Sequence, residues 1–599
     1  MWWLCFCIFL VVAADKRPEH VRVNYTVSNA SPDFSEPLRD WMQPIRIRIH
    51  DVNYTNLLSQ EMKDSLQQMF VETAERVSKI LKVFPVTGPL YLSRDVTRLC
   101  GNFVAGSKEK CMVRRNNDPT ETCRVDGNFQ IPDEHFEDFK LHTSNDEADS
   151  VVDIAGGPGL ANTDTVLYMS LGSLEYCNLI NTGIIAFTKI CKRDQFGRPI
   201  AAFINICPTE VLVVSRLKLS ETVFHEMLHA LGFTGSSLPF FAKDCRLANG
   251  ALNCEFVETS ALDSWVQFPS TVLADYSDLH ASEPRFELVT ENARSAWAEH
   301  VNCHHYSYDN RGPAWYTYKT DRLSGASNDA VGDHWVVESV MGSIMAPTVG
   351  EPYMQVLDNM TIAAFKDMGW YVVSDNYTQP YIWGRNSGCT FSHREYCTDV
   401  ASGTTESRFL CSSRGETGCH YLHLHKGICK GLGSGHCLAI TADEECFTEK
   451  PSPDGSYEQF CQDCRCIETT DEQKALCLER RCTPGGLLEL KFAGDWWVCP
   501  YGKSILVEVV NMTLHCPFSD VLCTERDRRL EEMIAAPPDP TSSSMQSSSS
   551  TDVYSSTTSV TSITTVREFS NPVSSSFKLN PLSPLLLFLF LYTLCSLVL

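Results

Sequence analysis

Basic residues are scarce in this chain of 599 residues. Lys and Arg number 50 against 74 Asp and Glu, which gives a formal net charge of −24 at pH 7. This acidic balance argues against a nucleic-acid partner and predicts a well-solvated surface. A phosphate-binding loop is missing too, because the glycine-rich run at 156–159 has neither the lysine nor the spacing of one. We therefore expect neither nucleic acid nor nucleotide as a partner.

Both ends of the chain have apolar runs without basic residues. Residues 1–14 are too short to span a bilayer and end in small residues, which predicts a signal peptide cleaved near Ala14. At the other end, small residues around Ser574, a polar spacer and a terminal apolar tail predict a GPI attachment signal. A membrane-spanning tail is the alternative, and the missing basic flank argues against it. We expect the protein on the extracellular face of the plasma membrane, GPI-anchored, or shed from it.

Cysteine usage agrees with secretion. Without Cys5, Cys7 and Cys595, the 27 cysteines leave 24 between Cys100 and Cys523, enough for twelve disulfides. Nine of them precede residue 386 and fifteen follow it, so full pairing requires at least one bridge across that boundary.

Two patterns in the cysteine-rich part resemble metal sites. We interpret Cys461-x-x-Cys464-x-Cys466 as disulfide cysteines rather than a metal knuckle, because the compartment is oxidising. The three histidines at 420, 423 and 425 are interpreted as loop or strand residues rather than a second zinc site.

The motif H-E-x-x-H begins at His225. Ser215 is a plausible N-cap of a helix that carries it, and Gly232 suits the residue that ends such a helix. Positions i and i+4 project from one helix face, so His225 and His229 can hold one Zn²⁺. Glu226 lies beside them and can polarise a water on the metal. The alternative is an ordinary helix whose two histidines are satisfied in the core.

A catalytic zinc needs a third protein ligand. The position six residues after the second histidine, which supplies it in compact metzincins, is Gly235 here. Downstream, Ser343-Ile-Met345-Ala-Pro347 is typical of the metzincin Met-turn. We choose His334, which lies eleven residues before Met345 and is the nearest candidate. The other candidates are His280, His300, His304 and His305, the last two beside Cys303 in what we interpret as a disulfide-tethered loop.

Longer motifs identify a family. They are H-E-M-x-H-A-L-G-F at 225–233, a histidine eleven residues before M-A-P, and T-I-A-A-F-K-D-M-G-W-Y at 361–371, with further matching segments at 162–169 and 383–389. With them the sequence resembles leishmanolysin, the major surface protease of kinetoplastids, and its invadolysin-type animal homologues, over roughly residues 41–525.

The resemblance implies an α+β fold: a metzincin-type two-lobe zinc peptidase domain with a large insertion, followed by a disulfide-rich C-terminal domain. It implies zinc on His225, His229 and His334, Glu226 as general base, and protein or peptide substrates. The chain departs from kinetoplastid members by a longer insertion between Gly232 and His334. It also lacks a cysteine between Cys7 and Cys100 that could cap the zinc as thiolate. Any latency must therefore work otherwise.

The expected organisation follows from composition and periodicity. The ranges are a signal peptide 1–14, a leader or prosegment 15–40, a catalytic domain 41–385 with its insertion at about 236–330, a Cys-rich domain 386–530, a Ser/Thr/Pro stalk 531–576 and a GPI signal 577–599. We expect the Cys-rich domain to be loop-rich. Helices are expected at 59–81, 215–231 and 359–368, and strands at 45–49, 89–92, 166–170, 183–190 and 199–206.

Sequons permit N-glycosylation at Asn24, Asn53, Asn359, Asn376 and Asn511. The leading hypothesis is a cell-surface zinc endopeptidase. The rival is an inactive surface adhesin or binding protein that keeps the fold, and such proteins usually lose the glutamate or a ligand. All four of these residues are present here.

Overall fold

The structure is a computed structural model. It describes residues 23–25, 38–54, 58–92, 94, 100–103, 111–114, 122–123, 129–142, 151–174, 177, 184–248, 251–256, 270–276, 285–304, 311–317, 331–347, 351–433, 437–470, 475–525 and 527–528. These ranges belong to one compact unit, Met1–Asp539, and the second unit is Pro540–Leu599. The expected signal peptide, most of the expected leader, the whole expected stalk, the predicted site at Ser574 and the terminal tail lie outside the described residues. Within these ranges no helix combines the length and the apolar character needed to cross a membrane.

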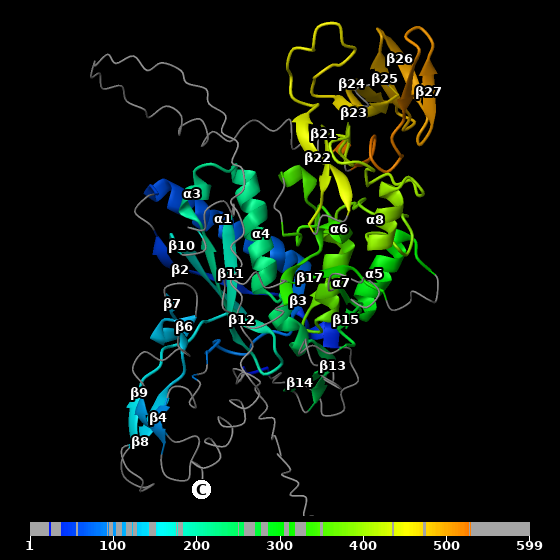
Figure 1. The fold of residues 1–599 in the computed structure, drawn as a ribbon. Coiled ribbons are helices and arrows are strands. Elements are labelled where there is room, and N and C mark those ends of the chain that lie inside the picture. The colour runs from blue at the N-terminus through cyan, green and yellow to red at the C-terminus, as the bar shows by residue number, and fades with distance from the viewer. Residues whose placement is uncertain are drawn as a thin grey trace, which may run out of the picture. The chain divides into compact units, whose positions relative to one another are not determined.

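A four-stranded sheet is built from the N-terminal part of the chain (Figure 1). Its order is β11 (Ala186–Arg193), β12 (Pro199–Ile206), β10 (Thr165–Leu171) and β2 (Ile47–Tyr54). Strand β10 runs parallel to β12 and β2, whereas β11 is antiparallel to β12 and forms an edge. All side chains of β10 and β12 are buried, as expected for strands covered on both faces. The predicted strands at 166–170 and 199–206 are confirmed, whereas the strand predicted at 183–190 runs from Ala186 to Arg193, three residues later along the chain.

Two helices cover one face of this sheet, α1 (Gln60–Ile80) and α4 (Arg216–Ala230) (Figure 1). The Ser59 side chain caps α1 by accepting a hydrogen bond from the Met62 amide. Arg76 of α1 pairs with Glu221 of α4 at 2.8 Å, and its guanidinium lies over the Phe224 ring. Both helices were predicted with these bounds to within a residue or two.

Residues after α4 build a second sheet. Beyond η4 (Gly235–Phe240) and the hairpin β13 (Ala242–Ala248) and β14 (Ala251–Phe256), the strands β15 (Leu273–Asp275), β16 (Phe286–Leu288), β17 (Ala314–Thr317) and β18 (Val331–Trp335) pair in that order. The helices are α5 (Glu291–Val301), α6 (Val337–Val340) and α7 (Asn359–Asp367). The predicted insertion thus supplies the strands beside β18.

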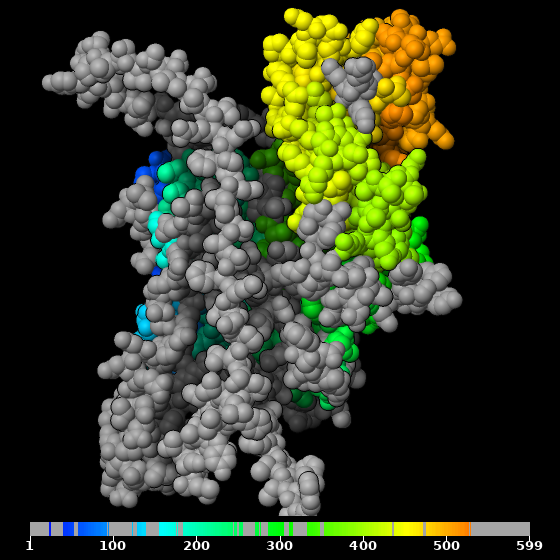
Figure 2. Space-filling model, viewed as in Figure 1, coloured from blue at the N-terminus to red at the C-terminus, as the bar shows by residue number. Residues whose placement is uncertain are grey.

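The Cys-rich region is built from strands, so the expectation of a loop-rich domain is wrong. After α8 (Arg394–Ala401) come β20 (Thr417–Cys419), β21 (His425–Gly431), β22 (Leu438–Glu445), β23 (Cys464–Thr469), β24 (Ala475–Cys482), β25 (Leu488–Phe492), β26 (Asp495–Cys499), β27 (Ser504–Val507) and β28 (Met512–His515). They form a three-stranded and a six-stranded sheet. Buried side chains alternate along β25, where Leu488, Leu490 and Phe492 face inward, a period-two signal that favours a strand. Figure 2 shows the yellow and orange residues of this region closely packed.

Eleven disulfides occur among the described residues. Cys303–Cys389 crosses residue 386, as the odd counts on either side require. Cys461 pairs with Cys464, and Cys466 pairs with Cys419. The disulfide interpretation of the C-x-x-C-x-C run is therefore confirmed.

The expectation at 89–92 is wrong. Leu90 and Leu92 form only isolated bridges, to Leu160 and Phe136. Pro89 has no amide hydrogen for a ladder, which explains why the pairing stays short. The strand expected at 45–49 begins at Ile47, because the amide of Ile45 donates instead to Leu81.

Candidate metal centre

Helix α4 carries two of the histidines. Its N-cap is Ser215, whose hydroxyl accepts a hydrogen bond from the Lys218 amide at 3.2 Å, as predicted. From Thr222 to Ala230 every side chain is buried; the helix packs against β11 and β12 of the sheet and against α1 beside it. The helix end therefore presents its polar side chains inside the molecule.

Gly232 ends this helix in the manner predicted. Its φ is +122°, and a Cβ there would lie 2.8 Å from the Trp370 ring, so only glycine fits. The amide of Gly232 donates to the His229 carbonyl and that of Phe233 to Leu228, the pattern of a Schellman turn. This turn brings the carbonyl of Phe233 to 2.6 Å from Nδ1 of His229.

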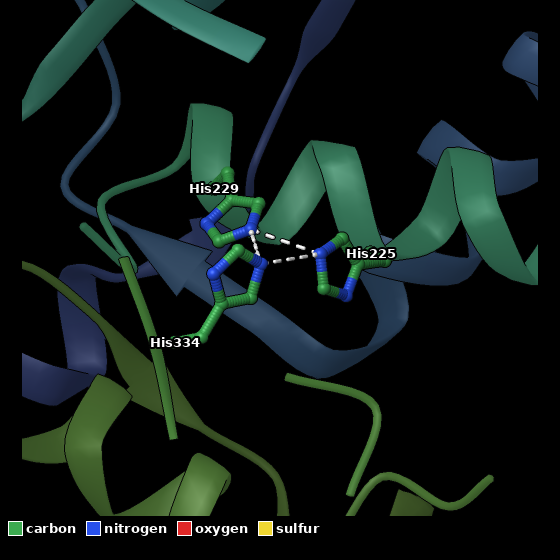
Figure 3. Close-up of side chains that lie close together, drawn as sticks. All are labelled: His225, His229 and His334. Carbon is green, nitrogen blue, oxygen red and sulfur yellow. Dashed lines mark hydrogen bonds between the residues drawn. The ribbon is translucent and has the colours of Figure 1, made fainter. Parts of the chain in front are cut away.

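His225, His229 and His334 converge (Figure 3). The Nε2 of His229 lies 2.9 Å from that of His225 and 3.2 Å from that of His334, and the third separation is 3.3 Å. A tetrahedral zinc with bonds of about 2.05 Å needs about 3.3 Å between ligand nitrogens. Two of the three separations match this value and the third is slightly short. Within the described residues this is the only group of three or more potential metal-binding side chains.

The tautomers explain why this cluster suits a cation. Nδ1 of His225 lies 2.5 Å from the Ile344 carbonyl, and Nδ1 of His229 lies against that of Phe233. Because a carbonyl only accepts, both Nδ1 atoms carry the hydrogen, and both Nε2 atoms point bare lone pairs at each other. Burial lowers the pKa of His225 to about 3 and that of His229 to about 4, and it holds the pKa of His334 well below its usual value. These two bare lone pairs repel unless a cation lies between them, and Nε2 of His334 lies 3.2 and 3.3 Å from the same two atoms, so the donor set fits a metal such as zinc.

Glu226 is the acid beside these histidines. It is buried, and its Oε2 accepts a hydrogen bond of 2.6 Å from the hydroxyl of Thr188 on β11. Burial raises the pKa of Glu226 to about 7, opposed by the Thr188 bond and supported by the charge of Asp333. Asp333 precedes His334 and accepts the Gly235 amide at 2.8 Å. Neither Thr188 nor Asp333 was predicted. The position of Asp333 beside His334 was a usable signal, whereas nothing in the sequence marks Thr188.

Met345 is fully buried at the turn that follows α6. The preceding carbonyl, of Ile344, is the acceptor for His225. The turn is held by Ser343, whose hydroxyl donates to Asp358 at 2.5 Å and accepts the Met345 amide at 3.1 Å. The carbonyl of Met345 accepts the amide of Trp335, directly after His334. This turn therefore holds His225 through the Ile344 carbonyl and Trp335, the neighbour of His334, through the Met345 carbonyl.

The other candidate histidines lie elsewhere. His300 Nε2 contacts the Trp383 carbonyl at 2.7 Å, and His304 is exposed. His280 and His305 lie outside the described residues. In the Cys-rich region, Nδ1 of His423 donates to the Cys466 carbonyl at 2.6 Å, and His425 Nε2 lies 3.3 Å from the Tyr353 hydroxyl.

The sequons differ in exposure. Asn24, Asn359, Asn376 and Asn511 are exposed, whereas Asn53 lies on β2 and its side chain is outside the described residues. Glycosylation of these four exposed asparagines is compatible with the fold and stays a prediction.

The chain matches the family model described as Leishmanolysin, over residues 147–247 and 323–436. These ranges include all three histidines and Glu226. The sheet strand β2 and the six-stranded sheet of the Cys-rich region lie outside them.

Curated relatives agree with the family match. The chain is 27% identical over 530 residues to the ciliated left-right organizer metallopeptidase of Danio rerio, covering 83% of this chain and 78% of the relative. The human protein of that name is 24% identical over 559 residues, 76% of this chain and 64% of the relative. The leishmanolysin-like peptidase of Caenorhabditis elegans is 24% identical over 382 residues, 60% of this chain and 53% of the relative. The chain thus spans less than two thirds of the length of several relatives. By family model and relatives together, residues 147–247 and 323–436 of this chain match the leishmanolysin family of metallopeptidases.

Proposed function

We propose that this protein is a cell-surface zinc-dependent endopeptidase of metzincin type, with two lobes around its cleft. The observation that carries the proposal is the convergence of three histidine Nε2 atoms beside a buried carboxylate. His225, His229 and His334 would hold the ion. Bound there, zinc supplies Lewis-acid chemistry: it activates a water molecule as nucleophile and polarises the carbonyl of the peptide bond.

Glu226 would act as the general base. Its buried carboxylate follows His225 on the same helix, so it lies next to the ligands without being one of them. In this role it takes a proton from the attacking water and returns it to the leaving amine. The rival, an inactive adhesin, finds no support in this set of residues, since neither the glutamate nor a histidine is missing.

The edge strand β11 would bind the substrate. It ends the four-stranded sheet, so one side of its main chain has no partner strand within the described residues. An extended peptide can pair with such an edge through main-chain hydrogen bonds. Since β11 also packs against α4, a peptide held there would run along the zinc helix.

An extracellular location, with GPI attachment at Ser574, remains part of the proposal. Eleven disulfides support an oxidising compartment, and four exposed sequons agree with secretion. Release of the protein from cells by phosphatidylinositol-specific phospholipase tests the anchor, and retention of a Leu599 peptide on the membrane after treatment contradicts it.

The test of function is hydrolysis of casein and of a quenched peptide library by the purified, fully processed protein. We expect cleavage that 1,10-phenanthroline stops and added zinc restores. Glu226→Ala should keep its zinc and lose at least about 100-fold in activity. Activity of Glu226→Ala within about threefold of wild type, or no cleavage by the zinc-loaded wild type, overturns the proposal.

A further inference from the structure

We propose that Thr188 is a positioning residue, whose hydroxyl fixes the orientation of the Glu226 carboxylate for proton transfer. The inference rests on the proposed peptidase function and concerns a residue on β11, not on the zinc helix. It assigns to the edge strand a second task besides binding the substrate main chain.

The contacts show which oxygen of Glu226 is held. Oγ1 of Thr188 lies 2.6 Å from Oε2 of Glu226 and 3.1 Å from its backbone carbonyl oxygen. Both partners only accept, and a threonine hydroxyl has one hydrogen to donate. The shorter contact to the charged oxygen takes it, because hydrogen bonds to ionised groups are the stronger. Among the described residues no other hydrogen bond reaches this carboxylate, so Oε1 is left to exchange the proton.

Thr188 is better fixed than the group it holds. A β-branched side chain on a strand has few χ1 choices, and Thr188 is paired with Ile204 in the β11–β12 ladder. Glu226 has three side-chain torsions, and its side chain is buried. The hydroxyl therefore transfers the rigidity of the sheet to the carboxylate.

The same strand would hold both reaction partners. A peptide paired with the free edge of β11 has its register set by the β11 main chain, and the Thr188 side chain sets the position of Glu226 from that main chain. Misplacement of a reacting group by about 1 Å can cost about 100-fold in rate. Because Glu226 is held by the same strand, β11, that would bind the substrate, such misplacement is limited.

A plain structural tie between β11 and α4 is the alternative role for Thr188. Loss of such a tie would lower stability or zinc content. Loss of positioning would instead lower kcat with little change in KM, because the contact acts on the base and not on the bound peptide.

The experiment compares Thr188→Val, Thr188→Ser and Thr222→Val in the full chain. Valine matches threonine in shape and suits a strand. Thr222 is the matched control: it is buried on α4, and its hydroxyl donates to the Lys218 carbonyl at 2.9 Å. Zinc content, thermal midpoint, kcat and KM are measured on one quenched peptide.

We expect Thr188→Val to keep stoichiometric zinc and a KM within about twofold, while kcat falls about tenfold or more. Thr188→Ser, which keeps the hydroxyl, should recover most of kcat, and Thr222→Val should match wild type. Wild-type kcat in Thr188→Val overturns the proposal. A loss in Thr188→Val that Thr188→Ser shares, or that comes with loss of zinc, assigns Thr188 a structural role and overturns it too.

Glu226→Ala separates this proposal from the one on which it rests. If Glu226→Ala is as active as wild type, the proposed function is wrong, whatever Thr188 does. If Glu226→Ala is inactive and Thr188→Val is fully active, the peptidase mechanism stands and only the positioning role of Thr188 is wrong.

Discussion

Backbone carbonyls orient the two helical histidines. His225 is held by the carbonyl of Ile344, in the turn after α6, and His229 by that of Phe233, in the turn that ends α4. For His334, no hydrogen bond to Nδ1 is found within the part of the chain that the structure describes. Its position instead depends on β18, whose residue Trp335 is anchored to the Met345 carbonyl and the Thr361 hydroxyl. Two of the proposed ligands are thus oriented by hydrogen-bond acceptors and the third by its strand.

Replacement of His334 tests the ligand set. His334→Ala should lose tight zinc binding, because two ligands on one helix face leave an incomplete site. Zinc is measured by inductively coupled plasma mass spectrometry after dialysis against a weak chelator. His300→Ala is the control, since its Nε2 contacts the Trp383 carbonyl and not the cluster. Stoichiometric zinc in His334→Ala, with loss of zinc in another histidine variant, means that His334 is not the ligand.

At the scale of elements, the buried carboxylate of Glu287 ties strand β16 to its neighbours. Glu287 receives hydrogen bonds from Arg311 at 2.7 and 2.5 Å and from Arg285 at 2.7 Å. Burial alone raises the pKa of Glu287, but the two arginines outweigh it and bring that pKa down to about 2. The charged cluster joins β16 to the segment before β17, which stands next to β18 in the sheet.

Glu287→Gln should therefore destabilise the fold with a defined pH dependence. Because the folded pKa is depressed, ionised Glu287 stabilises the fold above its unfolded pKa, about 4.3. That stabilisation is lost as the pH falls from there toward the folded pKa. At pH 7 the variant should lose about 3–5 kcal/mol of unfolding free energy.

Thermal midpoints measured from pH 7 to pH 2.5 check this expectation. The gap between wild type and Glu287→Gln should narrow below about pH 4. Glu489→Gln is the control, because its partner Arg481 is largely exposed and such pairs are worth about 1 kcal/mol at most. A gap that stays constant over the whole range contradicts the charge-pairing account.

A short part of the leader is also an element of the fold. Tyr25 is buried, and its hydroxyl donates to Asp194 at 2.5 Å and accepts from Arg198 at 2.8 Å. Main-chain groups of Val23 exchange two hydrogen bonds of 2.8 Å with the Gln195 side chain. Nearby, the Phe196 carbonyl accepts the indole N–H of Trp370, the ring against Gly232. These contacts link residues 23–25 to the turn that ends α4.

We expect Tyr25→Phe to lower stability, because it leaves two buried charged groups each short of a partner. The cost should be about 1–3 kcal/mol, read from the shift of the thermal midpoint. Tyr377→Phe serves as control, since Tyr377 is 43% exposed. Equal midpoints for Tyr25→Phe and wild type would mean that the leader contributes nothing to the folded state.

For the whole molecule, local periodicity predicted the elements near the metal centre better than the rest. The stripes of α1 and α4 and the apolar runs of β10 and β12 are short-range signals, as is the spacing of His225 and His229. His334 was chosen by its distance from Met345, and the structure brings it to the other two. The roles of Thr188 and of the carbonyls of Ile344 and Phe233 were not predicted. A hydrogen-bond partner that is supplied by a tertiary contact or by the backbone has no sequence pattern. In the Cys-rich region the frequent cysteines and turns hid the alternation of its strands.

The disulfides of the whole molecule bear on how activity is regulated. A thiolate that caps zinc must come from a free, accessible cysteine with a lowered pKa. The segment 15–40 contains no cysteine, and all 22 cysteines whose side chains are described are disulfide-bonded. Of the 24 between residues 100 and 523, only the side chains of Cys100 and Cys111 lie outside that set.

An organomercurial, which activates thiolate-capped enzymes by removing the sulfur ligand, should therefore leave the activity of this protein unchanged. The full-length purified protein is treated with the mercurial, and hydrolysis of a quenched peptide is followed together with the N-terminal sequence. Limited proteolysis of the leader serves as the comparison, because a segment that blocks the cleft sterically is relieved by cutting and not by a thiol reagent. A several-fold rise in activity that precedes any N-terminal cleavage would mean that a cysteine is free in the folded protein and reaches the metal centre. Cys100→Ser and Cys111→Ser would then identify which thiol it is.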